Sequence, residues 1–535
     1  VSMVVPVVCL AIVSAHCVYL LCPPIVKDSK NLSVAEYRIK IFKRLAQMST
    51  PNIPVIVGVS QILQRLTDPL LGKEPVQLMV DAVRAAAEDA GNSKLLDEIE
   101  SVRVIRGVWR YKNPAQYVAD ALSLGNVETC GTPYGGNMVQ NAVNQSVLEI
   151  QSGSKSCIVI TGAENGNSQA KALKAGVELP ITDIPGTYSR MLDEEHKMSS
   201  DGENNRGIRA PIQIYPIFEN AIRYSRGESI EAHQKRISEL WAGFSKVASN
   251  NPHAWLQNAV DAETIRTASA SNRMISFPYP KLMNSNNAVD MASALLVCST
   301  EKAKQMGIPE SQWIYPWSGT DAHDTYFVSN RDNLHSSPAI RIAGKRALEL
   351  LGMGTQDIDL IDVYSCFPSA VQVAVKELGL DDSKPLTVTG GLTFGGGPLN
   401  NYVMHSISRM VELLREAPGK KGMITANGGY LTKHAFGIYS SEQPPEGFKH
   451  EDVQAEVDAT FFREAVDEHE GEVTVESYTV MYGPSGPVTG HTACLLPDGR
   501  RTWANVTDAD TLLEMTRSEF CGKTGVVSKD GDIAL

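Results

Sequence analysis

The chain of 535 residues contains an internal repeat, and this repeat constrains the fold more than any other feature. The segments AVRAAAEDAGNSKLLDEIESVRV (82–104) and AGKRALELLGMGTQDIDLIDVY (343–364) both read as an amphipathic helix, a glycine break, an acidic turn and a strand. A second pair, 135–166 and 396–429, shares a glycine turn, a helix, another turn and a strand. Because matching positions lie roughly 260 residues apart, the sequence predicts two similar α/β halves.

The segments around the repeats predict further units. A mostly helical stretch follows the third strand of the first half, has no counterpart in the second half, and reads as an insertion that covers a site. The apolar run 292–298 predicts a buried strand that closes the first half. We therefore expect four units: an N-terminal extension (1–50), a first half (51–310) with its helical insertion (167–275), a second half (311–445), and a C-terminal domain (455–535).

The C-terminal domain differs from the rest in composition. The segment SSEQPPEGFKHED has the prolines and charges of a linker. Alternating β-rich runs between 473 and 506 follow it, divided by Gly-Pro turns and by PDGR, which is typical of hairpins. We predict a small antiparallel β-barrel, since a barrel leaves no open strand edge.

The first residues need a separate interpretation. Residues 1–26 carry no charged side chain and are long enough to span a bilayer, but Pro6 and His16 interrupt the run and no positive region precedes it. Met48 is followed by STPNIPVIVGVSQ, which reads as the start of a domain with a buried strand. We expect residues 1–47 to be an upstream extension outside the fold, with a membrane anchor as the rival interpretation.

Charge and cysteine content exclude several classes of function. The net charge of −12 argues against nucleic acid as a partner, because phosphate binding requires a basic face. The nine cysteines form no CxxC pair and no zinc-like spacing with histidine, so we expect no metal site and a reducing, cytoplasmic setting.

Several motifs in order resemble the thiolase superfamily, and most nearly its sterol-carrier-protein-type branch, over residues 52–440. They are VITGAEN, then DIDLIDVYSCFPSAV, then TGGL followed by GGP. The resemblance implies a duplicated thiolase fold of the α/β class, a coenzyme A thioester as ligand without another cofactor, and acyltransferase ancestry. The C-terminal domain resembles the OB-type barrels that accompany certain thiolase-like proteins as partner chains, here fused to the same chain.

The family's catalytic positions are occupied by other residues in this sequence. Thiolases use a cysteine at a helix N-terminus as nucleophile, a histidine that activates it, and a second cysteine that moves a proton. By the resemblance these positions fall at Gly136, Gly397 and Asn427. Cys130 lies six residues before Gly136 and would fill the first position only with a local gap. We therefore expect no thiolysis and no Claisen condensation through an acyl-cysteine.

Other side chains remain candidates for the same site. Tyr364 stands where the family holds a water with Asn or His, and thiolase-like aldolases that cleave steroid side-chain acyl-CoAs carry a tyrosine in the comparable motif. It would act as acid or base in a retro-aldol cleavage, or simply pack at a strand end. His405 and His434 are further pocket candidates. Asn137, Asn400 and Asn401 would contact a thioester oxygen or, as we expect, cap the helices that follow.

The sequence leaves three functions open. The first is a thiolase-like protein of lipid or steroid metabolism that binds an acyl-CoA without thiolase activity; the second is an acyl-CoA retro-aldolase that uses Tyr364. The third is a non-catalytic module that recruits an enzyme through its barrel. Family thiolases pair through the strand at NVETCGTPYGG, but Gly131 and Pro133 weaken that edge and the barrel would cover it. We therefore favour a monomer over the family's dimer, which stays the alternative, and we expect no nucleic acid or membrane as partner.

Overall fold

The computed structural model describes residues 52–535 of the chain. The predicted N-terminal extension and its rival, a membrane anchor, lie outside the described residues. Among the residues described, no helix has both the length and the apolar character needed to cross a membrane.

The first half builds a mixed sheet with the strand order β1-β8-β4-β2-β3-β5. Strand β8 is antiparallel to both β1 and β4, whereas β4, β2, β3 and β5 run parallel. Every residue of β4 and β8 is buried, as expected for strands that are covered on both faces. The bounds are β1 (Pro54–Leu63), β2 (Ser101–Val104), β3 (Glu128–Gly131), β4 (Cys157–Asn165), β5 (Arg190–Met191) and β8 (Asp290–Ser299).

The second half repeats this pattern in a sheet of order β10-β11-β12-β9-β13. Here β10 and β11 are parallel, and β12 is antiparallel to both β11 and β9. Strands β9, β12, β11 and β10 thus correspond to β1, β8, β4 and β2, which confirms the predicted duplication. The bounds are β9 (Tyr315–His323), β10 (Leu360–Asp362), β11 (Lys421–Gly428), β12 (Lys433–Ser440) and β13 (Lys449–Asp452).

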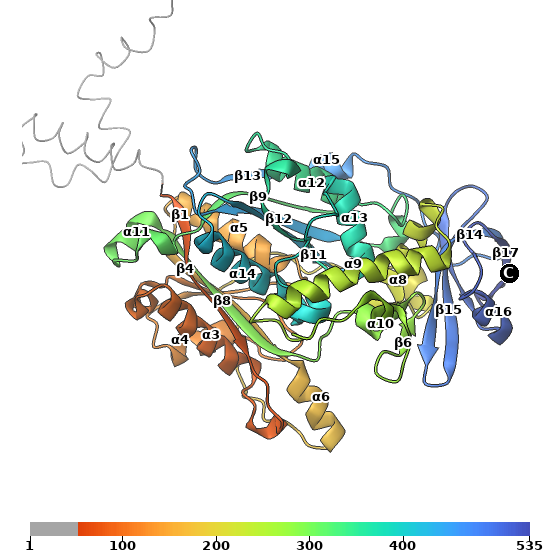
Figure 1. Cartoon of the computed structure of the whole chain (residues 1–535), viewed down its shortest axis with the longest axis horizontal. Helices are drawn as coiled ribbons and strands as arrows, with labels where there is room; N and C mark the ends of the chain where they lie inside the picture. Colours follow the sequence, from red (N-terminus) through yellow and green to blue (C-terminus); the bar gives the residue numbers. More distant parts are fainter. Residues whose placement is uncertain (1–51) are drawn as a thin grey trace, which may run out of the picture. The chain divides into compact units, whose positions relative to one another are not determined.

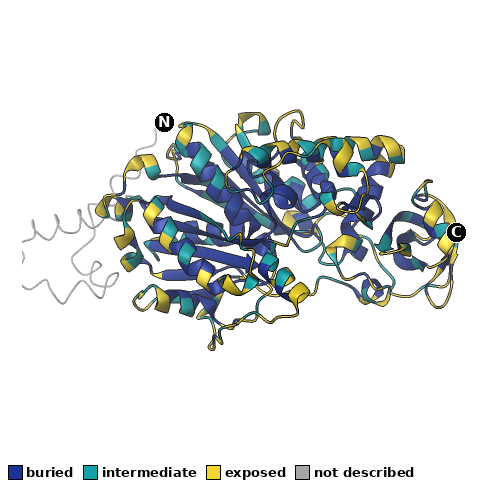
Figure 2. Cartoon of the chain, turned by 60° about the horizontal axis from the view of Figure 1, so that its bottom comes forward, coloured by how far each residue is buried: buried dark blue, intermediate teal, exposed yellow. Residues whose placement is uncertain are grey.

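Two helices lie between the sheets and two further pairs cover their outer faces (Figure 1). Helices α5 and α14 pack against strands of both sheets, and Figure 2 shows buried residues throughout this central layer. The amphipathic helices predicted from the repeat, α3 and α12, cover the outer faces. The bounds are α3 (Pro75–Asp89), α4 (Pro114–Ala121), α5 (Met138–Gln151), α11 (Thr300–Gln305), α12 (Pro338–Glu349), α13 (Pro368–Leu378) and α14 (Tyr402–Glu416).

The insertion after β4 is mostly helical, and two short strands follow its helices. Its longest helices, α8 and α9, have apolar faces that pack into the core shared with the second half. The bounds are α6 (Gly166–Ala175), α7 (Asp201–Asn205), α8 (Pro211–Ser225), α9 (Ile230–Asn250), α10 (Ala262–Arg266), β6 (Met274–Ser276) and β7 (Tyr279–Pro280).

The C-terminal domain is an antiparallel sheet of order β16-β15-β14-β17-β18, and strand β6 of the insertion pairs with β14. A bridge between Asn505 and Asp532 joins the two ends of this order. The segment interpreted as a linker is partly ordered, because β13 pairs with β9 and adds a strand to the second half. The bounds are β14 (Gly471–Gly483), β15 (Gly486–Leu495), β16 (Arg501–Val506), β17 (Thr524–Val527), β18 (Ile533–Ala534), α15 (Gln454–Asp458) and α16 (Ala509–Glu514).

The edge of β3, predicted to be poorly paired and covered by the C-terminal domain, is covered by the insertion instead. Strand β5 runs parallel to β3, with Arg190 opposite Cys130. Ser189 and Thr129 exchange hydrogen bonds just before this pairing. Strand β5 pairs with the last two of the four residues of β3.

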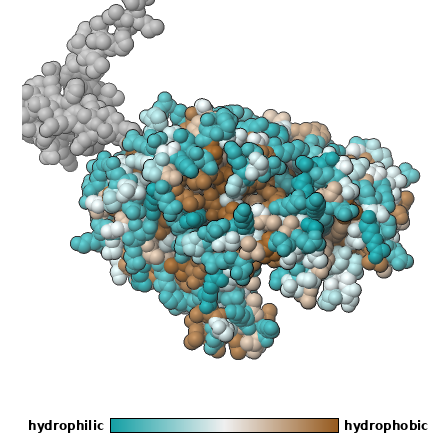
Figure 3. Space-filling view, in the orientation of Figure 1, coloured by the Kyte–Doolittle hydropathy of each residue, from teal (hydrophilic) through white to brown (hydrophobic). Residues whose placement is uncertain are grey.

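Exposed aliphatic side chains gather where α6 meets the short helix η3 (Pro69–Leu71). The exposed fractions are 74% for Leu71 and 83% for Leu173, and this tip is brown at the lower edge of Figure 3. These leucines belong to none of the three buried cores of the described chain.

Candidate functional site

A cavity of about 520 Å³ lies where the two halves meet, and it brings together four of the residues singled out from the sequence. Gly136 precedes α5, Tyr364 follows β10, and Asn427 lies near the end of β11. Asn400 belongs to the short helix η10 (Leu399–Asn401) that leads into α14. The carboxyl ends of parallel strands meet at one sheet edge, which places Tyr364 and Asn427 beside each other.

Gly136 is in direct contact with Tyr364. A Cβ atom at Gly136 would overlap the Tyr364 hydroxyl oxygen and would lie 2.5 Å from the backbone oxygen of Asn427. Real Cβ atoms do not approach other atoms this closely, so the position accepts no side chain without a shift of its neighbours. The tyrosine therefore occupies the space into which a cysteine side chain would project.

The Tyr364 phenol is available to a ligand in this cavity. Its backbone nitrogen donates to Thr425 Oγ1 at 2.9 Å, and its ring meets Tyr402 edge to face at 5.5 Å between centroids. No hydrogen bond joins its hydroxyl to another described residue. Burial raises the pKa of Tyr364 well above its ordinary value. The phenol thus stays protonated at neutral pH and can donate a hydrogen bond.

The structure adds Cys366 and Tyr215 to the site. Cys366 lines the cavity two residues after Tyr364, and burial raises its pKa to about 12, so the thiol is protonated. Tyr215, from α8 of the insertion, accepts hydrogen bonds from Asn427 Nδ2 and the Leu431 nitrogen, both at 3.0 Å. Cys366 was visible in the motif DVYSCF, whereas no sequence signal places a residue of the insertion beside Asn427.

Gly397 lies outside the lining of this cavity. Its nitrogen donates to the Asn286 oxygen at 3.0 Å. A Cβ there would lie 3.1 Å from Asn287 Oδ1 and 3.2 Å from the backbone oxygens of Asn286 and Leu392. These contacts are too close for the position to accept a larger side chain without rearrangement.

The expectation that asparagines cap the central helices is wrong for the two that stand at cap positions. Asn137 precedes α5 and Asn401 precedes α14, but neither side chain makes a capping hydrogen bond. Both residues have helical backbone angles, whereas capping requires an extended conformation. Asn401 Nδ2 instead donates to the Gly162 oxygen at 2.8 Å, and Asn400 Nδ2 donates to the Arg106 oxygen at 2.7 Å.

Three further candidates lie away from the cavity that contains Gly136. His434 is 2% exposed, with Nε2 at 3.2 Å from the Leu431 oxygen, and it lines a neighbouring cavity together with Asn137. Burial and the neighbouring His253 lower the pKa of His405 to about 3. Cys130 is fully buried in β3, where burial raises its pKa.

The walls of the cavity are aromatic and almost uncharged. Arg209 is the only charged residue among those that line it within the described chain. Across residues 52–535 no group of three or more His, Cys, Asp or Glu side chains is arranged to hold a metal ion. The aromatic residues in the lining are Tyr134, Tyr215, Tyr364, Phe367 and Tyr430.

Two duplicated α/β halves, with a central helix from each and a site where the halves meet, define a thiolase-like fold. The model of the Thiolase-like protein type 1 additional C-terminal domain matches residues 452–532. The crystal structure of a monomeric SCP2-thiolase like protein type 1 from Mycobacterium smegmatis is 30% identical, with a TM-score of 0.78 over 91% of this chain and 99% of that one.

More distant relatives share the fold. Acetyl-CoA acetyltransferase of Methanocaldococcus jannaschii is 23% identical over 304 residues, which cover 56% of this chain and 70% of the relative. The structure of the Ltp2-ChsH2(DUF35) aldolase is 21% identical, with a TM-score of 0.55 over 73% of this chain and 98% of that one. The chain belongs to the thiolase superfamily, and within it to the SCP2-thiolase-like proteins of type 1.

Proposed function

We propose that this protein binds an acyl-CoA thioester in the cavity at Gly136 and Tyr364, and that it does not form an acyl-cysteine. The contact between Gly136 and the Tyr364 hydroxyl carries the proposal, because it leaves no room for a nucleophile. Cys366 is the only cysteine among the described residues that line the cavity, and its pKa of about 12 keeps it in the unreactive protonated form. The name acetyl-CoA acetyltransferase, borne by the relative from Methanocaldococcus jannaschii, supports coenzyme A thioesters as the ligand class.

The test combines a thiolysis assay with a binding measurement on the full chain. Thiolysis of acetoacetyl-CoA would be followed as the loss of thioester enolate absorbance at high protein concentration, and octanoyl-CoA binding by calorimetry. We expect binding without turnover. Clear turnover would refute the proposal, and Cys366 and Cys130 would then be the first residues to replace.

A second candidate is a retro-aldolase, in which the bond between the α- and β-carbons of a 3-hydroxyacyl thioester breaks. Tyr364 donates its proton to the α-carbon, and the β-hydroxyl, which becomes a carbonyl, returns a proton to the phenolate. The free and protonated Tyr364 hydroxyl favours it, since such a group suits an acid. The aldolase among the structural neighbours supports the same reaction class. Tyr364→Phe would abolish turnover of a 3-hydroxyacyl-CoA but retain its binding; equal turnover in the variant would exclude this role.

The remaining assignments belong to the same proposal. We place the protein in lipid or steroid metabolism, in the cytoplasm and as a monomer, and we keep the four predicted domain boundaries and an OB-like C-terminal barrel. The similar protein from Mycobacterium smegmatis is described as monomeric, and this supports the proposed oligomeric state.

A further inference from the structure

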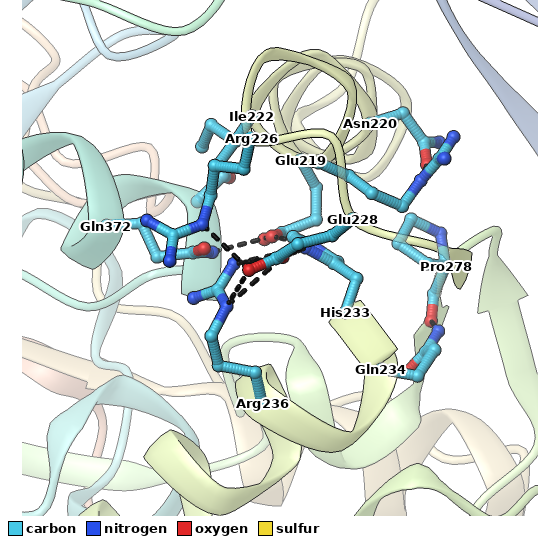
Figure 4. A network of polar contacts seen from close by, with 12 residues as sticks. Glu219, Asn220, Ile222, Arg226, Glu228, His233, Gln234, Arg236, Pro278 and Gln372 are labelled. Carbon is cyan, nitrogen blue, oxygen red and sulfur yellow. Dashed lines mark hydrogen bonds and ion pairs between the residues drawn. The ribbon is translucent and has the colours of Figure 1, made fainter. Parts of the chain in front are cut away.

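The insertion carries a buried charge cluster in which His233 lies between two carboxylates (Figure 4). Its Nε2 is 2.6 Å from Glu219 Oε1 and its Nδ1 is 2.7 Å from Glu228 Oε2. The side chains of His233 and Glu219 are fully buried. Arg226 and Arg236 both bind Glu228 as well.

Both ring nitrogens of His233 lie within hydrogen-bond distance of a carboxylate, and Arg236 Nη2 lies 3.1 Å from Nδ1. Burial would raise the pKa values of Glu219 and Glu228, but hydrogen bonds from His233 and other donors outweigh it and lower both. Each ring nitrogen therefore faces an ionised carboxylate.

Glu219 connects this cluster to the first turn of α13. It accepts hydrogen bonds from the Tyr279 hydroxyl at 2.5 Å and from Gln372 Nε2 at 2.6 Å. Because the Tyr279 hydroxyl donates its proton to Glu219, the Tyr279 oxygen is free to accept a hydrogen bond from the Ser369 nitrogen at 3.2 Å. Ser369 and Gln372 are one turn apart on α13, so Glu219 holds this helix at two points.

Helix α13 begins directly after the loop that carries Tyr364, Cys366 and Phe367 into the cavity. The Phe367 ring stacks on Tyr215 at 4.5 Å and on Tyr279 at 5.7 Å between centroids. Tyr215 lies one turn before Glu219 on α8. Helices α8 and α13 thus contribute residues to both the cluster and the cavity wall.

We propose that His233, Glu219 and Tyr279 are positioning residues that fix the loop 364–367 in the acyl-binding cavity. Buried charges contribute little net stability, since desolvation offsets their attraction, whereas they do restrict geometry. This inference rests on the proposed function only for the identity of the ligand. The hydrogen-bond chain from His233 through Glu219 to Tyr279 sets how tightly the acyl part binds, whereas the binding of coenzyme A alone depends on this chain less.

Tyr279→Phe tests this hydrogen-bond chain, because it removes the Tyr279 hydroxyl and keeps the stacking of the ring on Phe367. The matched control is Tyr478→Phe, which removes an equally buried hydroxyl, bound to the Ser518 oxygen in the C-terminal domain. By calorimetry on the full chain we expect Tyr279→Phe to weaken octanoyl-CoA binding about tenfold, while free coenzyme A binding and the control stay within about twofold of wild type. Wild-type affinity for octanoyl-CoA in Tyr279→Phe, or an equal loss in both variants, would overturn the proposal.

A second readout is independent of any ligand. Iodoacetamide labelling of Cys366, localised by peptide mass spectrometry, reports how tightly the loop is held. We expect faster labelling in Tyr279→Phe and in Glu219→Gln, with the wild-type rate in Tyr478→Phe. Unchanged Cys366 labelling in Tyr279→Phe would overturn the positioning role, whether or not the protein binds octanoyl-CoA. Failure of the wild-type protein to bind octanoyl-CoA would refute the proposed function, but not the positioning role.

Discussion

At the scale of single residues, the site depends on what Gly136 lacks. The Tyr364 hydroxyl and the Asn427 backbone oxygen fill the space that a side chain at Gly136 would need. Restoring a cysteine there would thus not restore a thiolase site unless Tyr364 moved. The absence of a side chain at Gly136 and the position of the Tyr364 phenol thus belong to one packing arrangement.

Gly136→Ala is expected to lower the free energy of unfolding by about 1–3 kcal/mol, because the new methyl group displaces Tyr364 and the Asn427 backbone. Urea denaturation measures the change. Gly125→Ala is the matched control, since a Cβ at Gly125 meets no atom within 4 Å. A Gly136→Ala variant as stable as the control would show that the contact is loose.

At the scale of elements, charged side chains hold two short segments of the insertion in place: strand β5 and the turn between α8 and α9. Strand β5 pairs with the edge of β3, and ion pairs hold it there: Arg190 lies 2.8 Å from Glu149 and 3.5 Å from Glu128. The turn between α8 and α9 supplies Glu228 to the buried cluster. Both segments use charged groups to fix a backbone that has little apolar area of its own.

Arg190→Glu is expected to release β5 and expose the edge of β3, so that the protein self-associates through strand pairing. Light scattering at several protein concentrations would show a mass above that of the monomer. Lys197→Glu is the control, because its partner Asp201 and Lys197 itself are exposed. An Arg190→Glu variant that stays monomeric would argue against the edge as a latent interface.

The buried cluster also predicts a pH dependence. Burial raises the pKa of Glu228, but hydrogen bonds from Arg236, Arg226 and His233 outweigh it, and the folded pKa is about 2 against an ordinary 4.5. A depressed pKa contributes stability above the unfolded value, and this stability is lost as pH falls from 4.5 towards 2. Between pH 4.5 and 2, the free energy of unfolding measured by urea denaturation should depend less on pH in Glu228→Gln than in wild type. Glu231→Gln, at an exposed position, should keep the wild-type dependence. A Glu228→Gln variant with the wild-type slope would contradict the assignment.

At the scale of the whole described chain, the C-terminal domain is bound to both the insertion and the second half. Arg501 is fully buried and pairs with both carboxylate oxygens of Glu476 at 2.7 Å. The same guanidinium donates to the Ser329 oxygen at 2.9 Å, and Trp503 Nε1 donates to Ser329 Oγ at 2.8 Å. Asn220 of α8 donates to the Tyr478 oxygen on the other side. The domain is thus joined to the second half and to α8, the helix that also carries Tyr215 of the cavity wall.

Arg501→Met is expected to destabilise the protein by about 3–5 kcal/mol, because it leaves the side chain of Glu476, which is only 14% exposed, without its partner. Scanning calorimetry would show a lower unfolding temperature for the whole described unit. The neighbouring Arg500→Met is the control, since within residues 52–535 the one ion pair of Arg500 is with the exposed Asp498. Equal effects of the two changes would contradict the structural role of Arg501.

Much of the fold was predictable because its signals are local. The repeated helix-and-strand pattern predicted the two halves, the alternating runs after 473 predicted the hairpins of the C-terminal domain, and the glycine turns predicted where the central helices begin. That the family's nucleophile position falls at Gly136 stays a prediction from the sequence. Local patterns of hydrophobicity and turn residues depend on the next few residues, and one sequence contains these in full.

Other features depend on how distant segments pack, and only the tertiary structure decided them. The sequence did not show that Tyr364 fills the space beside Gly136, that Tyr215 of the insertion binds Asn427, or that β5 covers β3. It also predicted helix caps at Asn137 and Asn401 that the backbone angles exclude. The sequence by itself determined the duplicated core; the tertiary structure decided how Gly136 and Tyr364 pack against each other, because contacts between distant residues follow from the path of the whole chain.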